Sequence, residues 1–132
     1  MGLKMAEKIR TIAYYENWSH STSGIKVSDS LQITYTGRTL EEENPQIDSG
    51  MAEITQEQFD ALCNLVEQNG FFSLDDNYSA SIDEWPHYSI TVQTPSISKT
   101  VNCKAWLHPQ FEAIQKKILE LWGKPILREA KD

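Results

Sequence analysis

The sequence has few basic residues, only two cysteines and no long apolar run. Its 12 lysines and arginines are scattered and outnumbered by 19 aspartates and glutamates, so the formal net charge is −7. Nucleic acids and anionic membranes are bound by clustered Lys and Arg, so we expect neither as a partner. No apolar run approaches a membrane span, and the first eight residues lack the apolar core of a signal peptide. We therefore expect a cytoplasmic protein that does not enter a membrane.

Cysteine and histidine are too sparse for a disulfide framework or a metal cluster. Cys63 and Cys103 are the two cysteines, and the three histidines share no metal-ligand spacing with them. Residues 75–86 alternate oxygen ligands as a calcium loop does, but Ala80 stands where such a loop needs glycine and Pro86 where it needs glutamate. We therefore expect no metal, no cofactor and no bond between the cysteines.

Catalytic motifs are also missing. No serine lies in a glycine elbow, and the six glycines are scattered rather than gathered in a phosphate-binding loop. Cys103 could form a thiol–imidazole pair with His87 or His108 if the fold brings them together. A thiol enzyme using Cys103 is therefore an open alternative, although the missing motifs favour a protein that is not an enzyme.

The best-defined element in the sequence is a helix that begins after Thr55. Thr55 suits an N-cap, and Gln58 three residues later completes a capping box. Gly70 can adopt the left-handed conformation that ends a helix. Between them an apolar stripe recurs at helical spacing, formed by Phe59, Leu62, Cys63 and Val66. Such a stripe predicts a helix that lies on a sheet.

Alternating apolar and polar residues predict strands before and after this helix. A first strand covers 8–16, and residues 17–24 are loop by composition. Hairpins follow at 25–35 and 88–103, and a further short strand is possible at 50–54. A last helix should begin near His108, with Pro109 in its first position, and end at Gly123.

Together these elements predict an α+β fold in the order β-β-β-(β)-α-β-β-α. Because each hairpin has one apolar face, we expect an antiparallel sheet of about five to six strands with two helices on one face. The other face should be Ser/Thr/Gln-rich and open to water. Residues 8–124 form the single domain, flanked by an N-terminal tail, 1–7, and a C-terminal tail, 125–132. The predicted core contains Phe59, Leu62, Val66, Phe71, Ile90, Val92, Ile114 and Ile118.

Two tryptophans in predicted loops are candidates for a binding surface. Trp18 and His20 lie in the loop after the first strand, and Trp85 and His87 precede a later strand. No core periodicity requires these residues, and rigid rings provide contact area at low entropy cost. The alternative is that each tryptophan folds back as a lid over the edge of the core. We predict a non-enzymatic protein-interaction module, with its partner and oligomeric state left open.

If both loops leave one end of the sheet, Trp18 and Trp85 form an aromatic patch. Its rim would be acidic, formed by Glu16, Asp83 and Glu84. An acidic rim around an apolar centre suits a basic or aromatic partner.

Several short motifs are shared with a known family. They are Tyr35-Thr36-Gly37-Arg38, Ile54-Thr55 with Phe59 and Leu62, Gly70-Phe71-Phe72-Ser73-Leu74, Glu84-Trp85-Pro86-His87-Tyr88 and Lys99-Thr100-Val101. This layout resembles a family of small bacterial domains of uncharacterised function, over roughly residues 9–121. That family usually carries a Cys-x-Gly-x-Cys-Pro element after its first strand. Residues 16–23 contain no cysteine, so any activity resting on that element would be absent here.

The central helix, the Phe-Phe stop, the strand Tyr88-Ser89-Ile90-Thr91-Val92 and the closing helix are also similar to emfourin. Emfourin is a small protein inhibitor of thermolysin-like metalloproteases. This resemblance leaves out the first hairpin and the acidic loop 38–49, and it implies no particular inhibitory residue. Inhibition of such proteases is therefore an alternative function.

Overall fold

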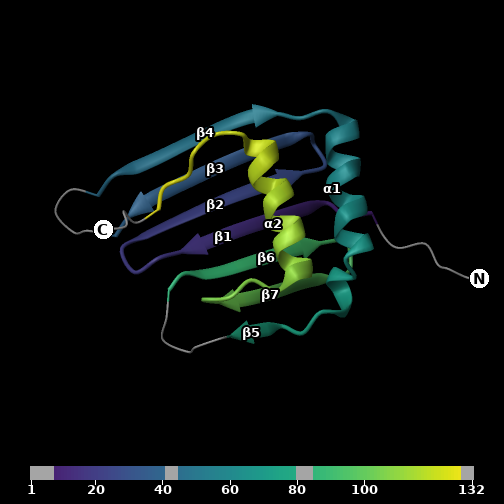
Figure 1. Cartoon of the computed structure of the whole chain (residues 1–132). Coiled ribbons are helices and arrows are strands. Elements are labelled where there is room, and N and C mark those ends of the chain that lie inside the picture. Colours follow the sequence, from purple (N-terminus) through teal and green to yellow (C-terminus); the bar gives the residue numbers. More distant parts are fainter. Residues whose placement is uncertain (1–7, 41–44, 80–84, 129–132) are drawn as a thin grey trace, which may run out of the picture.

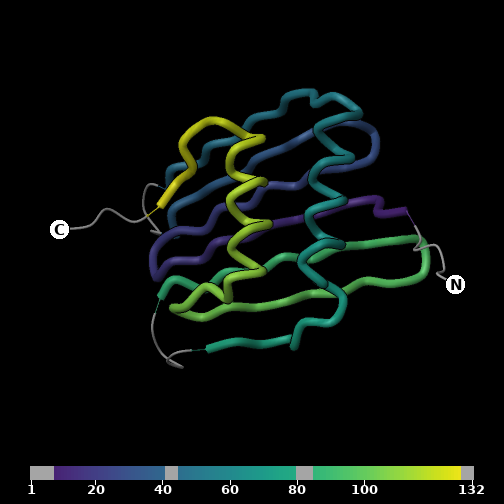
Figure 2. Tube along the Cα trace, turned by 45° about the vertical axis from the view of Figure 1, so that its right-hand side comes forward, coloured from purple at the N-terminus to yellow at the C-terminus, as the bar shows by residue number. Residues whose placement is uncertain are grey.

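Two helices lie side by side on one face of a twisted sheet in the computed structural model, which describes residues 8–40, 45–79 and 85–128 (Figures 1 and 2). The strands are β1 Thr11–Asn17, β2 Ser21–Ser28, β3 Gln32–Thr39, β4 Ile47–Glu53, β5 Asn77–Ser79, β6 His87–Gln93 and β7 Ser98–Lys104. The helices are α1 Gln56–Gln68 and α2 Pro109–Trp122, and a short 3₁₀ helix, η1, covers Phe71–Ser73. Both long helices cross the strands steeply (Figure 1). This arrangement confirms the predicted α+β class and the placement of both helices on one face.

The sheet has seven strands in the order β4-β3-β2-β1-β6-β7-β5, rather than the five to six predicted. It is also mixed rather than purely antiparallel, because β5 pairs with β7 in parallel. β5 is only three residues long, too short for any periodicity to reveal it. It is held at the edge by Asn102, whose backbone N–H donates to the Asp76 carbonyl at 2.8 Å, and by an ion pair between Lys99 and Asp76 at 2.9 Å.

The helix ends follow the local signals in the sequence. The Thr55 hydroxyl accepts from the Gln58 backbone N–H at 3.0 Å, and the Gln58 side chain accepts from the Thr55 N–H at 2.9 Å. Gly70 has φ of 62°, in the left-handed region. Pro109 occupies the first turn of α2 after the cap His108. All eight predicted core residues are buried between the helices and the sheet.

The sheet face away from the helices is polar, as predicted. On most strands the residues that alternate with the buried ones are Ser, Thr, Asn or Gln. Hydroxyls pair across strands on this face, since the Oγ1 atoms of Thr91 and Thr100 lie 2.7 Å apart. The ring of Tyr15 lies over Gly24, where an added Cβ would meet a ring carbon at 2.6 Å.

The second strand begins earlier than the composition of residues 17–24 indicates. Only residues 18–20 form the turn, and β2 starts at Ser21. The side chains of Ser21 and Ser23 face the helices and are buried although they are polar. A strand whose buried positions are serines has no apolar alternation, which is why the sequence pattern predicts a loop there.

The chain returns over the helix side of the sheet after α2. The Ser23 hydroxyl donates to the Leu127 carbonyl at 2.6 Å, and the Leu127 N–H donates to the Tyr35 hydroxyl at 2.7 Å. Gly37 leaves room for this contact, because a Cβ there would collide with the Tyr35 hydroxyl and lie 3.1 Å from the Leu127 Cβ. Residues 125–128, which the sequence assigns to a tail, are thus bound to β2 and β3.

Candidate functional site

One end of the sheet gathers aromatic and imidazole side chains from three segments. In the strand register Asn17, the last residue of β1, lies opposite His87, which in turn lies opposite Lys104 at the end of β7. The turn after β1, the approach to β6 and the segment after β7 therefore all leave from this end, on the left in Figure 1. We call it the aromatic end and define it by Trp18, His20, Trp85, His87, Trp106 and His108. All three histidines and three of the four tryptophans in the chain belong to it.

Trp85 and His87 form a stacked pair. Their ring centres lie 4.1 Å apart with an interplanar angle of 25°. Trp85 is 47% exposed, whereas His87 is partly buried and its Nε2 atom has no hydrogen-bond partner among the described residues. The stack holds a large, half-exposed ring in a defined position at the start of β6.

Trp18 and His20 occupy the β1–β2 turn but differ in exposure. The Trp18 indole N–H donates to Glu16 Oε2 at 2.7 Å, and the ring is partly buried. His20 is exposed, and its carbonyl accepts from the Leu40 N–H at 2.8 Å. The structure thus brings all four predicted residues to one end of the sheet. Trp18 is tied to a buried carboxylate, as the lid alternative predicts, while Trp85 is not covered in this way.

Trp106 and His108 are members of this end that the sequence analysis missed. Trp106 is 44% exposed and meets His108 edge-on at 5.8 Å, while Tyr78 of β5 packs on His108 at 4.4 Å. His108 Nδ1 accepts from the Gln110 backbone N–H at 3.1 Å, so the imidazole also caps α2. The predicted hairpin 88–103 could have indicated their position. In an antiparallel hairpin the residues after the second strand, here Trp106 and His108, lie near the start of the first strand.

Glu16 lies beneath the aromatic end and is fully buried. Its carboxylate accepts from the Tyr14 hydroxyl at 2.7 Å, from the Trp18 indole, and from Nη2 of Arg128 at 2.9 Å, with Arg128 Nε as a further donor. Gln115 of α2 donates to the Tyr14 hydroxyl at 2.9 Å. The expectation that Glu16 belongs to an exposed acidic rim is wrong, because its charge is buried and paired. Asp83 and Glu84, the other expected rim residues, lie outside the described residues.

The protonation states of this cluster are fixed by its surroundings. Burial raises the pKa of Glu16, but the hydrogen bonds from Arg128, Tyr14 and Trp18 together outweigh it and hold the pKa below its ordinary value of 4.5. Burial, followed by the charge of Glu16, raises the pKa of Tyr14 above its ordinary value. At neutral pH the carboxylate stays ionised and the phenol neutral. The cluster is therefore suited to holding the chain together rather than to proton transfer.

The cysteines do not favour thiol chemistry. Cys103 is fully buried on the helix side of β7, and burial raises the pKa of its thiol although a backbone hydrogen bond from His108 opposes the shift. The His108 ring nitrogen that faces the chain is occupied by Gln110. A protonated, covered thiol is a poor nucleophile, which weighs against an enzyme built on Cys103.

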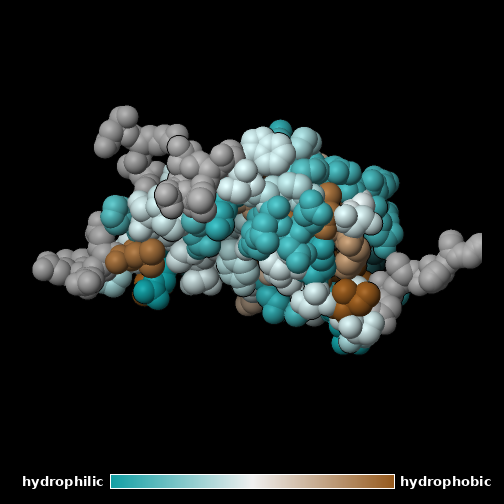
Figure 3. Space-filling model, turned by 90° about the horizontal axis from the view of Figure 1, so that it is seen from below, coloured by the Kyte–Doolittle hydropathy of each residue, from teal (hydrophilic) through white to brown (hydrophobic). Residues whose placement is uncertain are grey.

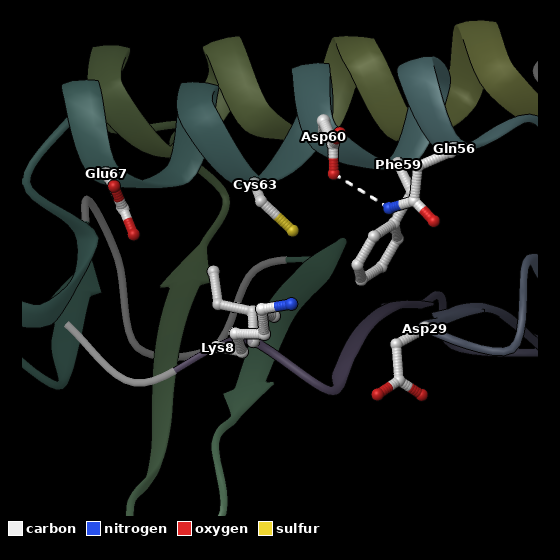
Figure 4. Close-up of a pocket in the computed structure, with 8 residues that line it drawn as sticks. Lys8, Asp29, Gln56, Phe59, Asp60, Cys63 and Glu67 are labelled. Atoms are coloured by element: carbon white, nitrogen blue, oxygen red, sulfur yellow. Dashed lines mark hydrogen bonds between the residues drawn. The ribbon is translucent and has the colours of Figure 1, made fainter. Parts of the chain in front are cut away.

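A cavity that is lined by a thiol lies at the opposite end of the sheet, beside α1 (Figure 4). It has a volume of about 320 Å³, and the Cys63 sulfur points into it between α1 and Lys8. Burial, and then the charges of Asp60 and Glu67, raise the pKa of Cys63 to about 12. The thiol is therefore protonated at neutral pH, and the carboxylates beside it raise its pKa further instead of stabilising a thiolate. Lining residues are Lys8, Ile9, Asp29, Gln56, Phe59, Asp60, Cys63 and Glu67.

Two further observations concern metals and membranes. Within the described ranges, no three His, Cys, Asp or Glu side chains lie close enough together to hold a metal ion. Neither helix in the described part of the chain is both long and apolar enough to cross a bilayer.

Seen from below, the molecular surface is mostly hydrophilic, with apolar side chains in small separate groups (Figure 3). On this side, hydrophilic groups therefore dominate the surface that a partner could contact.

Comparison with known proteins places the chain in a family. The sequence profile described as "Domain of unknown function (DUF6438)" matches residues 22–122. The chain belongs to this family. The DUF6438 match confirms the predicted membership of a family of small uncharacterised domains and runs from the second residue of β2 to the end of α2. Trp85, His87 and Trp106 lie inside the matched range, whereas Trp18 and Arg128 lie outside it.

No curated protein matches the chain. The similarity of this DUF6438 domain to emfourin therefore receives no support from the comparisons, and protease inhibition remains only a resemblance.

Proposed function

We propose that this DUF6438 domain is a non-enzymatic protein-interaction module that binds its partner through the aromatic end. The observation that carries the proposal is the stack of Trp85 on His87, which presents a ring that is 47% exposed. A ring already held in place loses little conformational freedom when a partner covers it. Tryptophans of this kind are over-represented among residues that dominate binding energy.

The second exposed tryptophan supports the same surface. Trp106 is 44% exposed and stands at the end of β7, on the strand next to the one that Trp85 precedes. It too is held by an imidazole, that of His108. Both rings lie in the range that matches the family. Trp18 acts differently in this proposal, as a lid whose indole covers Glu16.

The charges on the described part of this end favour a partner with acidic rather than basic groups around an apolar contact. Glu16 is neutralised by Arg128, so it offers no negative rim. Lys104 and Arg38 lie in one cross-strand row at this end of the open face. Complementary charge at a rim mainly affects the rate and specificity of association.

We further propose that the protein works in a reducing compartment, which we take to be the cytoplasm. Cys63 and Cys103 are both free thiols, on α1 and β7. Proteins in oxidising compartments rarely keep unpaired cysteines.

The proposal is tested by immobilising wild type and two alanine variants and comparing the proteins that each captures from its source lysate. Trp85→Ala removes the exposed ring. Ile97→Ala is the matched control, because Ile97 is 53% exposed in the β6–β7 turn at the opposite end of the sheet. We expect Trp85→Ala to lose a specific partner and Ile97→Ala to retain it, with thermal midpoints close to wild type. Capture of the same proteins by Trp85→Ala at wild-type yield would refute the proposal.

A further inference from the structure

Within the described residues, the outer edge of β4 is a row of backbone hydrogen-bonding groups that no strand pairs with. The bonds that flank the β3–β4 ladder run from Thr39 N–H to the Gln46 carbonyl at 2.9 Å and from Ile54 N–H to the Leu31 carbonyl at 3.0 Å. In an antiparallel pair such bonds fall on every second residue. In the observed register, Asp48, Gly50 and Ala52 therefore bond to β3. The N–H and C=O groups of the residues between them point away from the sheet, namely those of Ile47, Ser49, Met51 and Glu53.

This edge lacks most of the devices that block strand addition, and Asp48 and Glu53 are its only charged residues. Exposed edges are commonly protected by proline, lysine, a bulge or a very short strand. β5, at the other edge, has only three residues, whereas β4 has seven and pairs without a bulge. Its sequence contains neither proline nor lysine, and Ile47 and Met51 are 68% and 63% exposed. Among the described strands, none pairs with its outer side.

A cavity of about 340 Å³ lies on the helix side of the same edge. Gly50 has no side chain, so the Trp122 ring packs against it, 2.9 Å from where a Cβ would stand. Trp122 is 6% exposed, and its indole N–H is buried without a hydrogen-bond partner among the described residues. A buried donor without an acceptor costs free energy, so this one is poised to gain an acceptor. The lining residues are Tyr35, Asp48, Ser49, Gly50, Trp122, Lys124 and Pro125.

The charges in this cavity indicate what an incoming side chain should carry. Lys124 Nζ lies 5.2 Å from the centre of the Trp122 ring, and the Asp48 carboxylate lines the same cavity. One cation and one anion disfavour a ligand with net charge. A neutral carboxamide fits Trp122 and Asp48, because its carbonyl can accept from the Trp122 indole while its NH₂ donates to the Asp48 carboxylate.

We infer that the β4 edge binds an extended segment of a protein partner, which adds to the sheet as an eighth strand. The partner backbone bonds to the outward groups of Ile47, Ser49, Met51 and Glu53. Its inward residue opposite Gly50 is Asn or Gln and reaches the Trp122 indole. Strand addition of this kind draws affinity from main-chain hydrogen bonds and specificity from alternate side chains. The inference uses no residue of the aromatic end, so it stands or falls separately from the proposed function.

The test begins with selection of a phage-displayed random heptapeptide library on the immobilised full chain. Ser49→Pro removes one outward N–H without touching the β3 ladder, and proline is tolerated at such edge positions. Ser49→Ala is its matched control, because it keeps the N–H. We expect enriched peptides with alternating β-forming residues and one fixed Asn or Gln. A synthetic peptide of the enriched sequence should bind Ser49→Pro about tenfold more weakly than Ser49→Ala, as expected for one lost hydrogen bond.

Amide hydrogen exchange of the wild type tests the same contacts without any variant. The synthetic peptide should slow exchange at Ile47, Ser49, Met51 and Glu53 and shift the NMR signal of the Trp122 indole proton. The inference is overturned if no peptide is enriched, if binding is equal in Ser49→Pro and Ser49→Ala, or if these amides exchange unchanged. It is also overturned if sedimentation shows a wild-type dimer that Ser49→Pro abolishes, because a second copy of the chain would then occupy the edge.

Discussion

Glu16 and Arg128, separated by 112 residues, form a two-contact ion pair beneath the aromatic end of the sheet. Glu16 is fully buried, while the Arg128 side chain is 43% exposed, so the guanidinium covers the carboxylate from the solvent side. The pair ties the segment after α2 to the end of β1. Both residues lie outside the range that matches DUF6438.

The first prediction is that Arg128→Ala lowers the free energy of unfolding. Hydrogen bonds to a charged group contribute about 1.5–3 kcal/mol, and Arg128 is partly exposed, so we expect a loss in the lower part of that range. Arg128→Lys should recover part of the loss, since lysine keeps the charge but not the two-pronged geometry. Urea denaturation measures both.

The matched control for that measurement is Lys117→Ala. Lys117 forms an exposed ion pair with Glu120 at 3.2 Å on the surface of α2. Such pairs are worth less than about 1 kcal/mol. Equal losses in Arg128→Ala and Lys117→Ala would show that the Glu16 pair adds no more than a surface contact.

The second prediction follows from the lowered pKa of Glu16. In the unfolded chain this carboxyl titrates near its ordinary pKa of 4.5, and in the fold it titrates lower. Its contribution to stability is therefore complete above the unfolded value and is lost as pH falls through the folded value. Glu16→Gln should be less stable than wild type at neutral pH, and the difference should shrink as the pH falls below about 4.5. Free energies of unfolding across the acid range measure this, and a difference that stays constant down to pH about 3 would contradict it.

A third prediction compares two glycines in neighbouring parts of the sheet. An added Cβ at Gly50 would lie 2.9 Å from the Trp122 ring, which is buried and packed in the core. An added Cβ at Gly24 would lie 2.6 Å from the Tyr15 ring, which is 44% exposed and can swing toward solvent. Gly50→Ala should therefore cost about 1–3 kcal/mol, as overpacking does, and Gly24→Ala much less. Thermal denaturation of the two variants gives the order, and a larger loss for Gly24→Ala would show that the Tyr15 ring is rigid.

Much of the fold could be predicted because its signals are local. The Thr55–Gln58 capping box and the left-handed Gly70 lie within a few residues of the helix end that they define. What could not be predicted depends on residues far apart in the chain. The buried serines of β2 are stabilised in part by the carbonyl of Leu127, 104 residues from Ser23. No pattern within residues 17–24 could indicate that partner.

The candidate site also has parts that depend on local signals and parts that depend on residues far apart in the chain. The register of the β6–β7 hairpin is a local property, and it brings His87 to the same end as Lys104. Trp18 joins that end through the pairing of β1 with β6, two strands far apart in the chain. The buried state of Glu16 depends on Arg128, so an acidic rim was a reasonable but incorrect expectation from neighbouring residues alone. Trp106 was missed because it follows a strand without belonging to any periodic segment, although the register of that strand determines where it lies.

The last prediction concerns the reactivity of the two free thiols. Burial raises the pKa of Cys63 to about 12 and also raises that of Cys103. Because the thiolate is the reactive form, alkylation by iodoacetamide at pH about 8 should be far slower for both than for a cysteine in a short peptide. Cys63 is only partly buried, so it should react first, and its rate should climb as the pH rises toward the pKa. Cys103 should react only when the protein unfolds, so its labelling should follow the urea transition. Mass spectrometry of each cysteine-containing peptide measures the two rates. Rapid labelling of Cys103 in the folded protein would revive the thiol-enzyme alternative, because it would require an accessible and ionised sulfur where the fold shows a covered and protonated one.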